Sequence, residues 1–182
     1  VEAARSAVNA AKFPPLGKRS FGPYRAAQYS FGVSEYMPRA DELSTLIVQV
    51  ESEDAARNVD GILSVPGIDA VFMGPNDLAF SMLREGESFF GGGFGSSGVS
   101  RGVEGANQWT GFARTPEVIS LCEEVLEKCK AAGLPFGMTS ASIQEAREWL
   151  AKGANFMTFG SDFLFMRAGA RYMSQPPDTA KP

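Results

Sequence analysis

The sequence predicts an α/β fold with a mainly parallel sheet. Strand and helix patterns alternate along the chain, as they do in proteins built from successive β/α units. The 182 residues are 44% hydrophobic and 21% charged, which indicates one soluble globular unit with a buried core. This length is below the roughly 250 residues that a complete (β/α)₈ barrel needs.

The first part of the chain predicts a helix, an irregular segment and a strand. Residues 1–12 repeat small apolar side chains at helical spacing and precede two prolines, so we expect the end of a helix here. Residues 17–44 show no regular pattern. The apolar run 45–50 predicts a buried strand that leads into Glu51. Ser52 is the expected N-cap of the helix that follows.

The middle of the chain predicts a second strand, a turn and a long insertion. Residues 69–73 form the strand, and 74–78 read as a tight turn. Residues 84–112 are rich in glycine and lack periodicity, so we expect a flexible insertion. Residues 1–174 are interpreted as a single domain, with a disordered tail at 175–182.

The last part of the chain predicts two further strands with their helices. Thr115 followed by proline marks a helix start, and 134–139 is the next strand. Ser142 is the expected cap of the following helix. Residues 156–159 form the fourth strand, and 163–173 form a very apolar final helix. One helix followed by four strand–helix units fits either half of a barrel or a small doubly wound sheet.

Charge and composition exclude several classes of function. The net charge is −4 and the basic residues are scattered, so we expect neither a nucleic-acid partner nor a membrane surface partner. Cys122 and Cys129 lie seven residues apart on one helix, about 10 Å, which is too far for a disulfide. Reduced cysteines indicate a cytoplasmic protein. The chain contains no histidine, so its chemistry must depend on carboxylates, a metal ion or groups elsewhere.

Two carboxylates follow neighbouring strands of the predicted sheet. Glu51 comes directly after the first strand, and Asp77 comes shortly after the second. Carboxyl ends of parallel strands converge at one edge, so the two groups are able to share a cation. Oxygen ligands without histidine or thiolate favour Mg²⁺ or Mn²⁺. The alternative is that Glu51 is only a helix-start acid and Asp77 only a turn acid.

Several motifs resemble the HpcH/HpaI family of class II pyruvate aldolases. They are Val48-Gln-Val-Glu-Ser52, Asn58-Val-Asp-Gly-Ile62, and the run from Val65-Pro-Gly-Ile to Gly74-Pro-Asn-Asp-Leu78. Gly153–Asp162 resembles the last strand of that family. The resemblance implies a (β/α)₈ TIM barrel, of which this chain is the C-terminal part, about half.

The resemblance also implies a function and a set of site residues. The implied reaction cleaves or forms 2-oxo-3-deoxy or 4-hydroxy-2-oxo acids, giving pyruvate and an aldehyde through a metal-bound pyruvate enolate. Glu51 and Asp77 match the metal ligands, for Mg²⁺ or Mn²⁺ with Co²⁺ as a further option, and Gln49 matches a catalytic glutamine. The turn Gly74-Pro75-Asn76-Asp77 matches the backbone that binds the pyruvate carboxylate.

Some features of the family are missing from this sequence. The family's catalytic histidine and keto-polarising arginine belong to the first half of the barrel, so we expect this chain alone to turn over slowly or not at all. The alternatives are a citrate-lyase-like enzyme acting on acyl-CoA, and an inactive fragment with a structural or interaction role. The resemblance further implies a homo-oligomer in which the helix at 163–173 packs on a neighbouring subunit.

Overall fold

The centre of the molecule is a four-stranded parallel sheet with strand order β1-β2-β3-β4. The structure, a computed structural model, describes residues 1–84, 115–140 and 142–174. All neighbouring strands run parallel, which confirms the predicted fold class and places all four carboxyl ends at one edge. The strands are β1 (Ile47–Val50), β2 (Ala70–Met73), β3 (Phe136–Ser140) and β4 (Phe156–Phe159).

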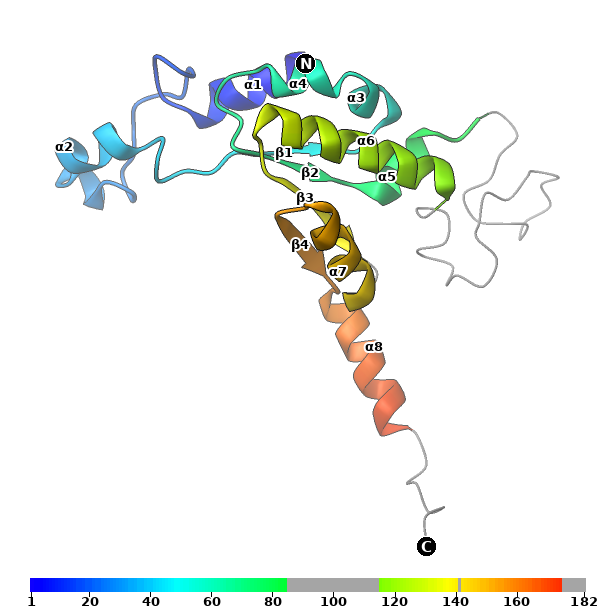
Figure 1. Cartoon of the computed structure of the whole chain (residues 1–182). Coiled ribbons are helices and arrows are strands. Elements are labelled where there is room, and N and C mark those ends of the chain that lie inside the picture. Colours follow the sequence, from blue (N-terminus) through cyan, green and yellow to red (C-terminus); the bar gives the residue numbers. More distant parts are fainter. Residues whose placement is uncertain (85–114, 141, 175–182) are drawn as a thin grey trace, which may run out of the picture.

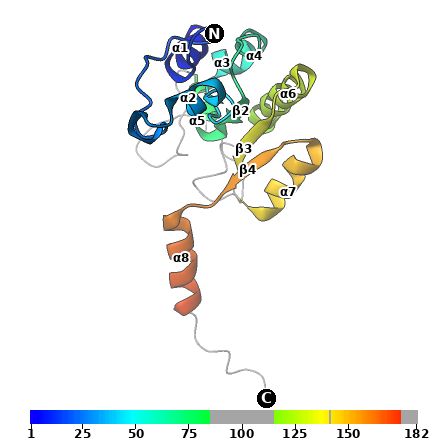
Figure 2. The same ribbon diagram turned by 90° about the vertical axis from the view of Figure 1, so that its left-hand side faces the viewer.

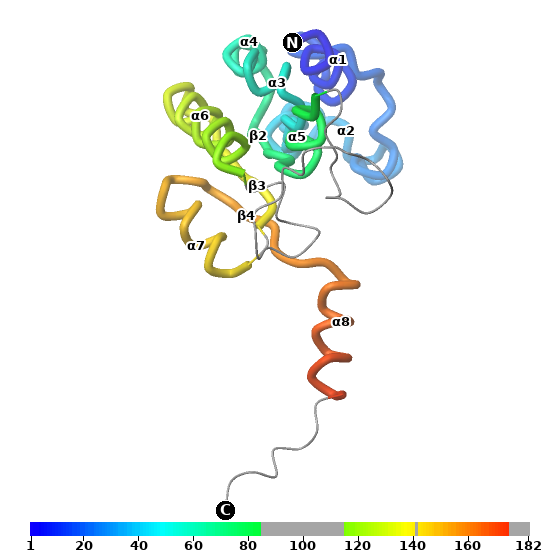
Figure 3. Tube along the Cα trace, turned by 90° about the vertical axis from the view of Figure 1, so that its right-hand side faces the viewer, coloured from blue at the N-terminus to red at the C-terminus, as the bar shows by residue number. Residues whose placement is uncertain are grey.

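Helices cover one face of this sheet and form an arc around the strands (Figure 3). The opposite face carries no helix in the described ranges, as the end-on views show (Figures 2 and 3). The result is an open half of a barrel. The arc consists of α1 (Glu2–Ala11), α3 (Glu53–Arg57), α4 (Val59–Leu63), α6 (Pro116–Ala132) and α7 (Ile143–Lys152).

The hydrophobic core lies between the sheet and this helix layer. Alternate strand residues face it, because side chains in a strand point to opposite sides. Val50, Met73 and Met138 are fully buried there, and α6 contributes a complete apolar stripe. Trp149 of α7 is buried and stacks on Phe136 with ring centroids 6.3 Å apart.

The predicted helix starts are confirmed by their capping bonds. The hydroxyl groups of Ser52, Thr115 and Ser142 each accept a hydrogen bond from the backbone N–H three residues later, at 3.3, 3.4 and 3.1 Å. Gly133 and Gly153 end α6 and α7 with φ of 69° and 108°, a conformation that favours glycine. Local sequence therefore sets most element boundaries.

Three expectations for the N-terminal half are wrong in detail. The helix after Ser52 is two helices, which meet at Asn58, where the backbone leaves the helical conformation with φ −98° and ψ 21°. The segment 17–44 contains a short helix, α2 (Val33–Tyr36), between two 3₁₀ turns. The turn at 74–78 is the start of a helix, α5 (Pro75–Ser81), because proline suits the first helical position.

A buried ion pair joins α1 to the amino end of the sheet. The Lys12 side chain is 2% exposed, and its ammonium group lies 2.8 Å from the Asp69 carboxylate. It also donates to the carbonyl of Ser44 at 2.8 Å, while the Leu46 N–H donates to Asp69 at 2.6 Å. This network fixes the irregular segment to the entrance of β1, opposite the strand ends that carry Glu51.

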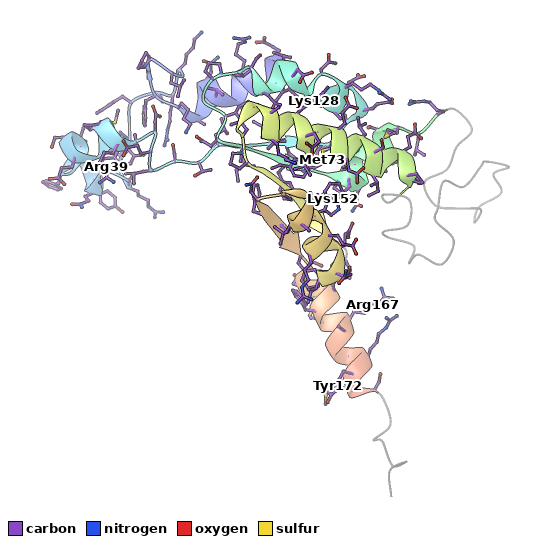
Figure 4. All side chains as sticks on the ribbon, in the orientation of Figure 1. Arg39, Met73, Lys128, Lys152, Arg167 and Tyr172 are labelled. Carbon is purple, nitrogen blue, oxygen red and sulfur yellow. The ribbon has the colours of Figure 1, made fainter. Side chains whose placement is uncertain are left out.

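Helix α8 (Asp162–Met173) extends from the end of β4 away from the rest of the molecule (Figure 1). None of its residues is buried, and Arg167 and Tyr172 point into solvent (Figure 4). Its apolar residues stay largely exposed, although the Phe165 ring meets that of Phe159 on β4 edge to face, with ring centroids 6.2 Å apart. The expected packing of this helix on a neighbouring subunit stays a prediction.

Two other expectations concern segments outside the described residues. One is the flexible insertion expected at 84–112, of which the structure describes only Arg84, and the other is the tail at 175–182. Among the described helices, none is long and apolar enough to cross a membrane.

The two cysteines are predicted to be unreactive in the folded protein. Both are buried on α6 and outside any disulfide, and burial raises the pKa of Cys129 to about 11. At pH 8 about one Cys129 in a thousand is then a thiolate, and only the thiolate is nucleophilic. We expect negligible labelling by a thiol-specific disulfide reagent in the native chain and two equivalents in guanidinium chloride. Rapid labelling of the native chain at pH 8 would contradict this packing.

Candidate metal and substrate site

The candidate site begins at the carboxyl end of β1. Gln49 and Glu51 are two residues apart, so their side chains leave the strand on the same face, opposite the helix layer. The Gln49 amide donates a hydrogen bond of 2.6 Å to the Glu51 carboxylate. Both residues are exposed, so the carboxylate has one oxygen oriented by the amide and remains open to a ligand.

The neighbouring strand adds a glycine that allows these side chains to lie close to the backbone. The Gly74 N–H donates to the Val50 carbonyl at 3.0 Å, which continues the β1–β2 ladder to the level of Glu51. A Cβ atom at Gly74 would lie 2.9 Å from the Glu51 Cβ and 3.1 Å from the Gln49 amide nitrogen. Only glycine therefore fits beneath this pair of side chains.

The second carboxylate comes from α5, which starts directly after Gly74. Pro75 is the first residue of this helix, and Asp77 lies in its first turn. Asn76 and Asp77 are exposed, and the N–H groups of a first turn have no acceptor within their own helix. The structure thus brings Gln49, Glu51 and Gly74 into contact and places Asn76 and Asp77 in the first turn of α5, after the neighbouring strand.

The two strand ends with carboxylates lie side by side in the sheet. The end of β3 carries Ser140, whose hydroxyl group donates to the Thr158 carbonyl at 3.2 Å. In the parts of the chain that the structure describes, no group of three or more histidine, cysteine, aspartate or glutamate residues gathers around one point. A cation at this edge would take at most two carboxylates from these residues, and substrate or water would complete its shell.

Residues 1–91 match the model of the HpcH/HpaI aldolase/citrate lyase family. That match covers half of the 182 residues. The chain belongs to this family.

The relatives of this family member include both characterised enzymes and solved structures. This chain is 36% identical to a 2-keto-3-deoxy-L-rhamnonate aldolase from Salmonella paratyphi B over 164 residues. The aligned region covers 90% of this chain and 52% of that protein. The chain thus spans about half the length of the curated relatives it matches. An HpcH/HpaI aldolase/citrate lyase family protein from Burkholderia cenocepacia superposes with a TM-score of 0.72 at 27% identity, over 94% of this chain and 59% of that one.

A third likeness concerns the fold alone. Macrophomate synthase superposes with a TM-score of 0.69 at 19% identity, over 96% of this chain and 54% of that chain. The four parallel β/α units of this HpcH/HpaI family member are therefore part of a TIM-type barrel. The alternative of a complete small doubly wound sheet is wrong.

The sequence interpretation missed one group of residues near the site of this family member. Glu53 is the first residue of α3, and its N–H donates to the Ser81 hydroxyl at the end of α5, at 2.8 Å. Its carboxylate accepts from Arg84 at 2.7 Å and from Arg57 at 2.8 Å. The guanidinium groups of Arg84 and Arg57 hold the pKa of Glu53 below its usual range.

These contacts join the two elements that carry the candidate ligands. Glu51 lies just before α3, and Asp77 lies in α5, so the Glu53–Ser81 bond limits how far the two can separate. The spacing of Glu53 and Arg57, four residues apart on a helix, is the only part of this group that the sequence could have revealed. The contacts to Ser81 and Arg84 span 28 and 31 residues and depend on the fold.

Proposed function

We propose that this chain is part of an aldolase that forms or cleaves a carbon–carbon bond next to pyruvate. The proposed substrates are 2-oxo-3-deoxy or 4-hydroxy-2-oxo acids, with pyruvate and an aldehyde as products. The observation that carries the proposal is the Glu51 carboxylate, held by Gln49 above Gly74 at the edge where Asp77 also lies. Membership of the family and the 36% identity to a named aldolase support it.

We infer that Glu51 and Asp77 hold a divalent cation, Mg²⁺ or Mn²⁺, with Co²⁺ as a further option. Both groups are hard oxygen donors, both are exposed, and no thiolate or imidazole competes in this chain. When bound, such an ion supplies Lewis-acid stabilisation of negative charge that develops on a substrate oxygen. Glu51 is held for this role because the Gln49 amide restricts its rotation.

The loop after β2 is the proposed binding place for the pyruvate carboxylate. Gly74 allows close approach to the backbone, and Pro75 starts the helix without requiring an N–H acceptor. In this proposal the N–H groups of Asn76 and Asp77, which have no acceptor within the first turn of α5, bind that carboxylate. Helix starts stabilise anions through such free N–H groups.

Proton transfer is the step that the residues of this chain support least. The chain contains no histidine, and general acid–base catalysis typically contributes 10²–10⁴-fold to a reaction rate. We therefore expect the 182-residue chain to release pyruvate more slowly, by about this factor, than aldolases that use a positioned base.

The test is pyruvate release from a 4-hydroxy-2-oxo acid in the presence of Mg²⁺ or Mn²⁺, followed through lactate dehydrogenase and NADH. We expect slow release that stops when EDTA removes the cation. An acyl-CoA substrate assayed in parallel tests the citrate-lyase-like alternative. Cation-independent release, or turnover of the acyl-CoA alone, would refute the proposal, and a chain that neither binds Mn²⁺ nor reacts would support an inactive structural role.

We further infer that the protein works in the cytoplasm and forms homo-oligomers. The first inference rests on the two reduced cysteines, and the second on the exposed apolar residues of α8. Phe163, Leu164, Phe165 and Met166 are each more than 40% exposed, which is unusual for four consecutive apolar residues.

A further inference from the structure

Helices α3 and α5 lie side by side next to the candidate site (Figures 2 and 3). Helix α3 begins two residues after Glu51, and Asp77 lies in the first turn of α5. A divalent cation holds its oxygen ligands at bond lengths of about 2.0–2.6 Å, so two carboxylates share one cation only if their backbones keep a suitable spacing. The contacts between α3 and α5 therefore affect the geometry of this site.

Two hydrogen bonds in series join the backbones of these helices through the Ser81 hydroxyl group. The Glu53 N–H donates to Ser81 Oγ at 2.8 Å, and Ser81 Oγ donates to the Leu78 carbonyl at 2.7 Å. Glu53 is the first residue of α3, so its N–H has no acceptor within its own helix. Ser81, the last residue of α5, supplies that acceptor, and its proton binds the carbonyl of the residue after Asp77.

Both ends of this bridge are anchored in the hydrophobic core. Leu78 on α5 and Ala56 on α3 are fully buried. The Ser52 hydroxyl group also caps α3 by accepting from the Ala55 N–H at 3.3 Å. Interiors packed at this density resist displacement, so the bridge connects two backbones that are each held in place.

An ion pair makes a second connection between the same two elements. The Glu53 side chain is 16% exposed, and one of its carboxylate oxygens accepts from Arg57 on α3 at 2.8 Å. The other oxygen accepts from Arg84, three residues after the end of α5, at 2.7 Å. Because both oxygens bind arginine, Glu53 serves as a link between the elements rather than as a further cation ligand.

We propose that Ser81 is a positioning residue that fixes the spacing of Glu51 and Asp77 and thereby favours Mg²⁺ and Mn²⁺ over Ca²⁺. This inference rests on the proposed binding of a divalent cation by those two carboxylates. Mg²⁺ requires near-ideal octahedral geometry at about 2.0–2.1 Å, whereas Ca²⁺ accepts irregular shells at about 2.3–2.6 Å. Looser spacing therefore weakens Mg²⁺ binding more than Ca²⁺ binding.

The test is Ser81→Ala, with Mn²⁺ binding followed by electron paramagnetic resonance and with Mg²⁺ or Ca²⁺ as competitor. The substitution removes both hydrogen bonds of the bridge and only one heavy atom. We expect the Mn²⁺ and Mg²⁺ affinities to fall by about 10-fold, as for other residues that orient ligands, and the Ca²⁺ affinity to change much less. Ser81→Thr keeps the hydroxyl group and should retain the affinities of the unmodified chain.

The matched control is Ser64→Ala. The Ser64 hydroxyl group donates to the Gly61 carbonyl at 2.8 Å, three residues back, just as Ser81 donates to Leu78. Ser64 follows α4, which carries neither candidate ligand, so this variant should keep the Mg²⁺-to-Ca²⁺ preference of the unmodified chain.

Amide hydrogen exchange at Glu53 tests the bridge without any metal. Its N–H should exchange slowly in the unmodified chain and in Ser64→Ala, and faster in Ser81→Ala. Rapid exchange in the unmodified chain would show that the bridge does not persist in solution and would overturn the proposal.

The metal measurements separate this inference from the proposed function. Normal Mn²⁺ binding by the unmodified chain with unchanged affinities in Ser81→Ala would overturn the positioning role and leave the metal site standing. An equal loss for Mg²⁺ and Ca²⁺, or a Ser81→Thr variant as weak as Ser81→Ala, would also overturn it. An unmodified chain that binds no Mn²⁺ would overturn the proposed metal site, and this inference with it.

Discussion

Replacement of Glu51 by glutamine or of Asp77 by asparagine is expected to weaken Mn²⁺ binding by at least about 100-fold. Residues that only orient a metal ligand typically contribute 10–100-fold to affinity, and loss of a ligand itself should cost no less. Each substitution keeps the size of the side chain but removes the negative charge that a hard cation requires. The same variants should abolish any residual pyruvate release.

The measurement is Mn²⁺ titration followed by electron paramagnetic resonance, which reports binding without requiring activity. Asp54→Asn is the matched control, since Asp54 is an exposed acid in the first turn of α3, three residues after Glu51. Its loss should change affinity little, because it is not at the strand end. Equal weakening by all three substitutions would show that the site attracts cations only through its general negative charge. Unchanged binding in the Glu51 or Asp77 variant would place the metal elsewhere.

Gln49 should act through Glu51. The hydrogen bond from its side-chain amide to the Glu51 carboxylate is short, at 2.6 Å. The backbone of Gly74 lies directly against both side chains and limits how far they can move. Glu53 and Ser81 support the same geometry from the helix side. The ligands are thus positioned by contacts that persist without a cation, which lowers the entropy lost on binding.

Replacement of Asp69 by asparagine is expected to destabilise the fold by about 3 kcal/mol. The Lys12 ammonium group would remain buried without a negative partner, and breaking a buried pair on one side typically costs 3–5 kcal/mol. We take the lower end because the Asp69 side chain is 39% exposed. For a chain of this length the melting temperature should fall by roughly 6–12 °C.

The double variant separates charge from packing. Lys12→Met with Asp69→Asn removes both charges, so it should recover part of the stability lost in Asp69→Asn alone. Lys130→Met is the control, because Lys130 pairs with Glu127 on the exposed surface of α6, where an ion pair contributes little. If Asp69→Asn lowers the free energy of unfolding no more than the control does, the Lys12 charge is solvated. A double variant less stable than Asp69→Asn would mean that Lys12 stabilises mainly through its contacts to backbone carbonyls.

The same pair predicts sensitivity to acid. Burial alone would raise the pKa of Asp69, but the Leu46 N–H and the Lys12 ammonium together keep it below its usual value. A carboxyl group with a lowered folded pKa stabilises the protein fully above its unfolded pKa, near 4, and the effect is lost as the pH falls through the folded pKa. The stability difference between the unmodified chain and Asp69→Asn should therefore shrink below about pH 4.

Local signals in the sequence determined most of the secondary structure and the position of the candidate carboxylates. Hydrophobic periodicity located all four strands, and Ser52, Thr115 and Ser142 marked helix starts because their hydroxyl groups bond to nearby N–H groups. The order of strands and helices placed Glu51 and Asp77 at the same edge, since every parallel strand ends there. The family resemblance supplied the proposed roles of Gln49 and Gly74.

Only the tertiary structure decided the features that depend on residues far apart in the chain. The pairing of Lys12 with Asp69 spans 57 residues, and the bond between Glu53 and Ser81 spans 28. Neither has a local pattern, because any lysine or glutamate on a helix has the same sequence signature whether it meets solvent or a distant partner. The start of α5 at Pro75 was equally ambiguous, since glycine followed by proline suits both a turn and a helix start.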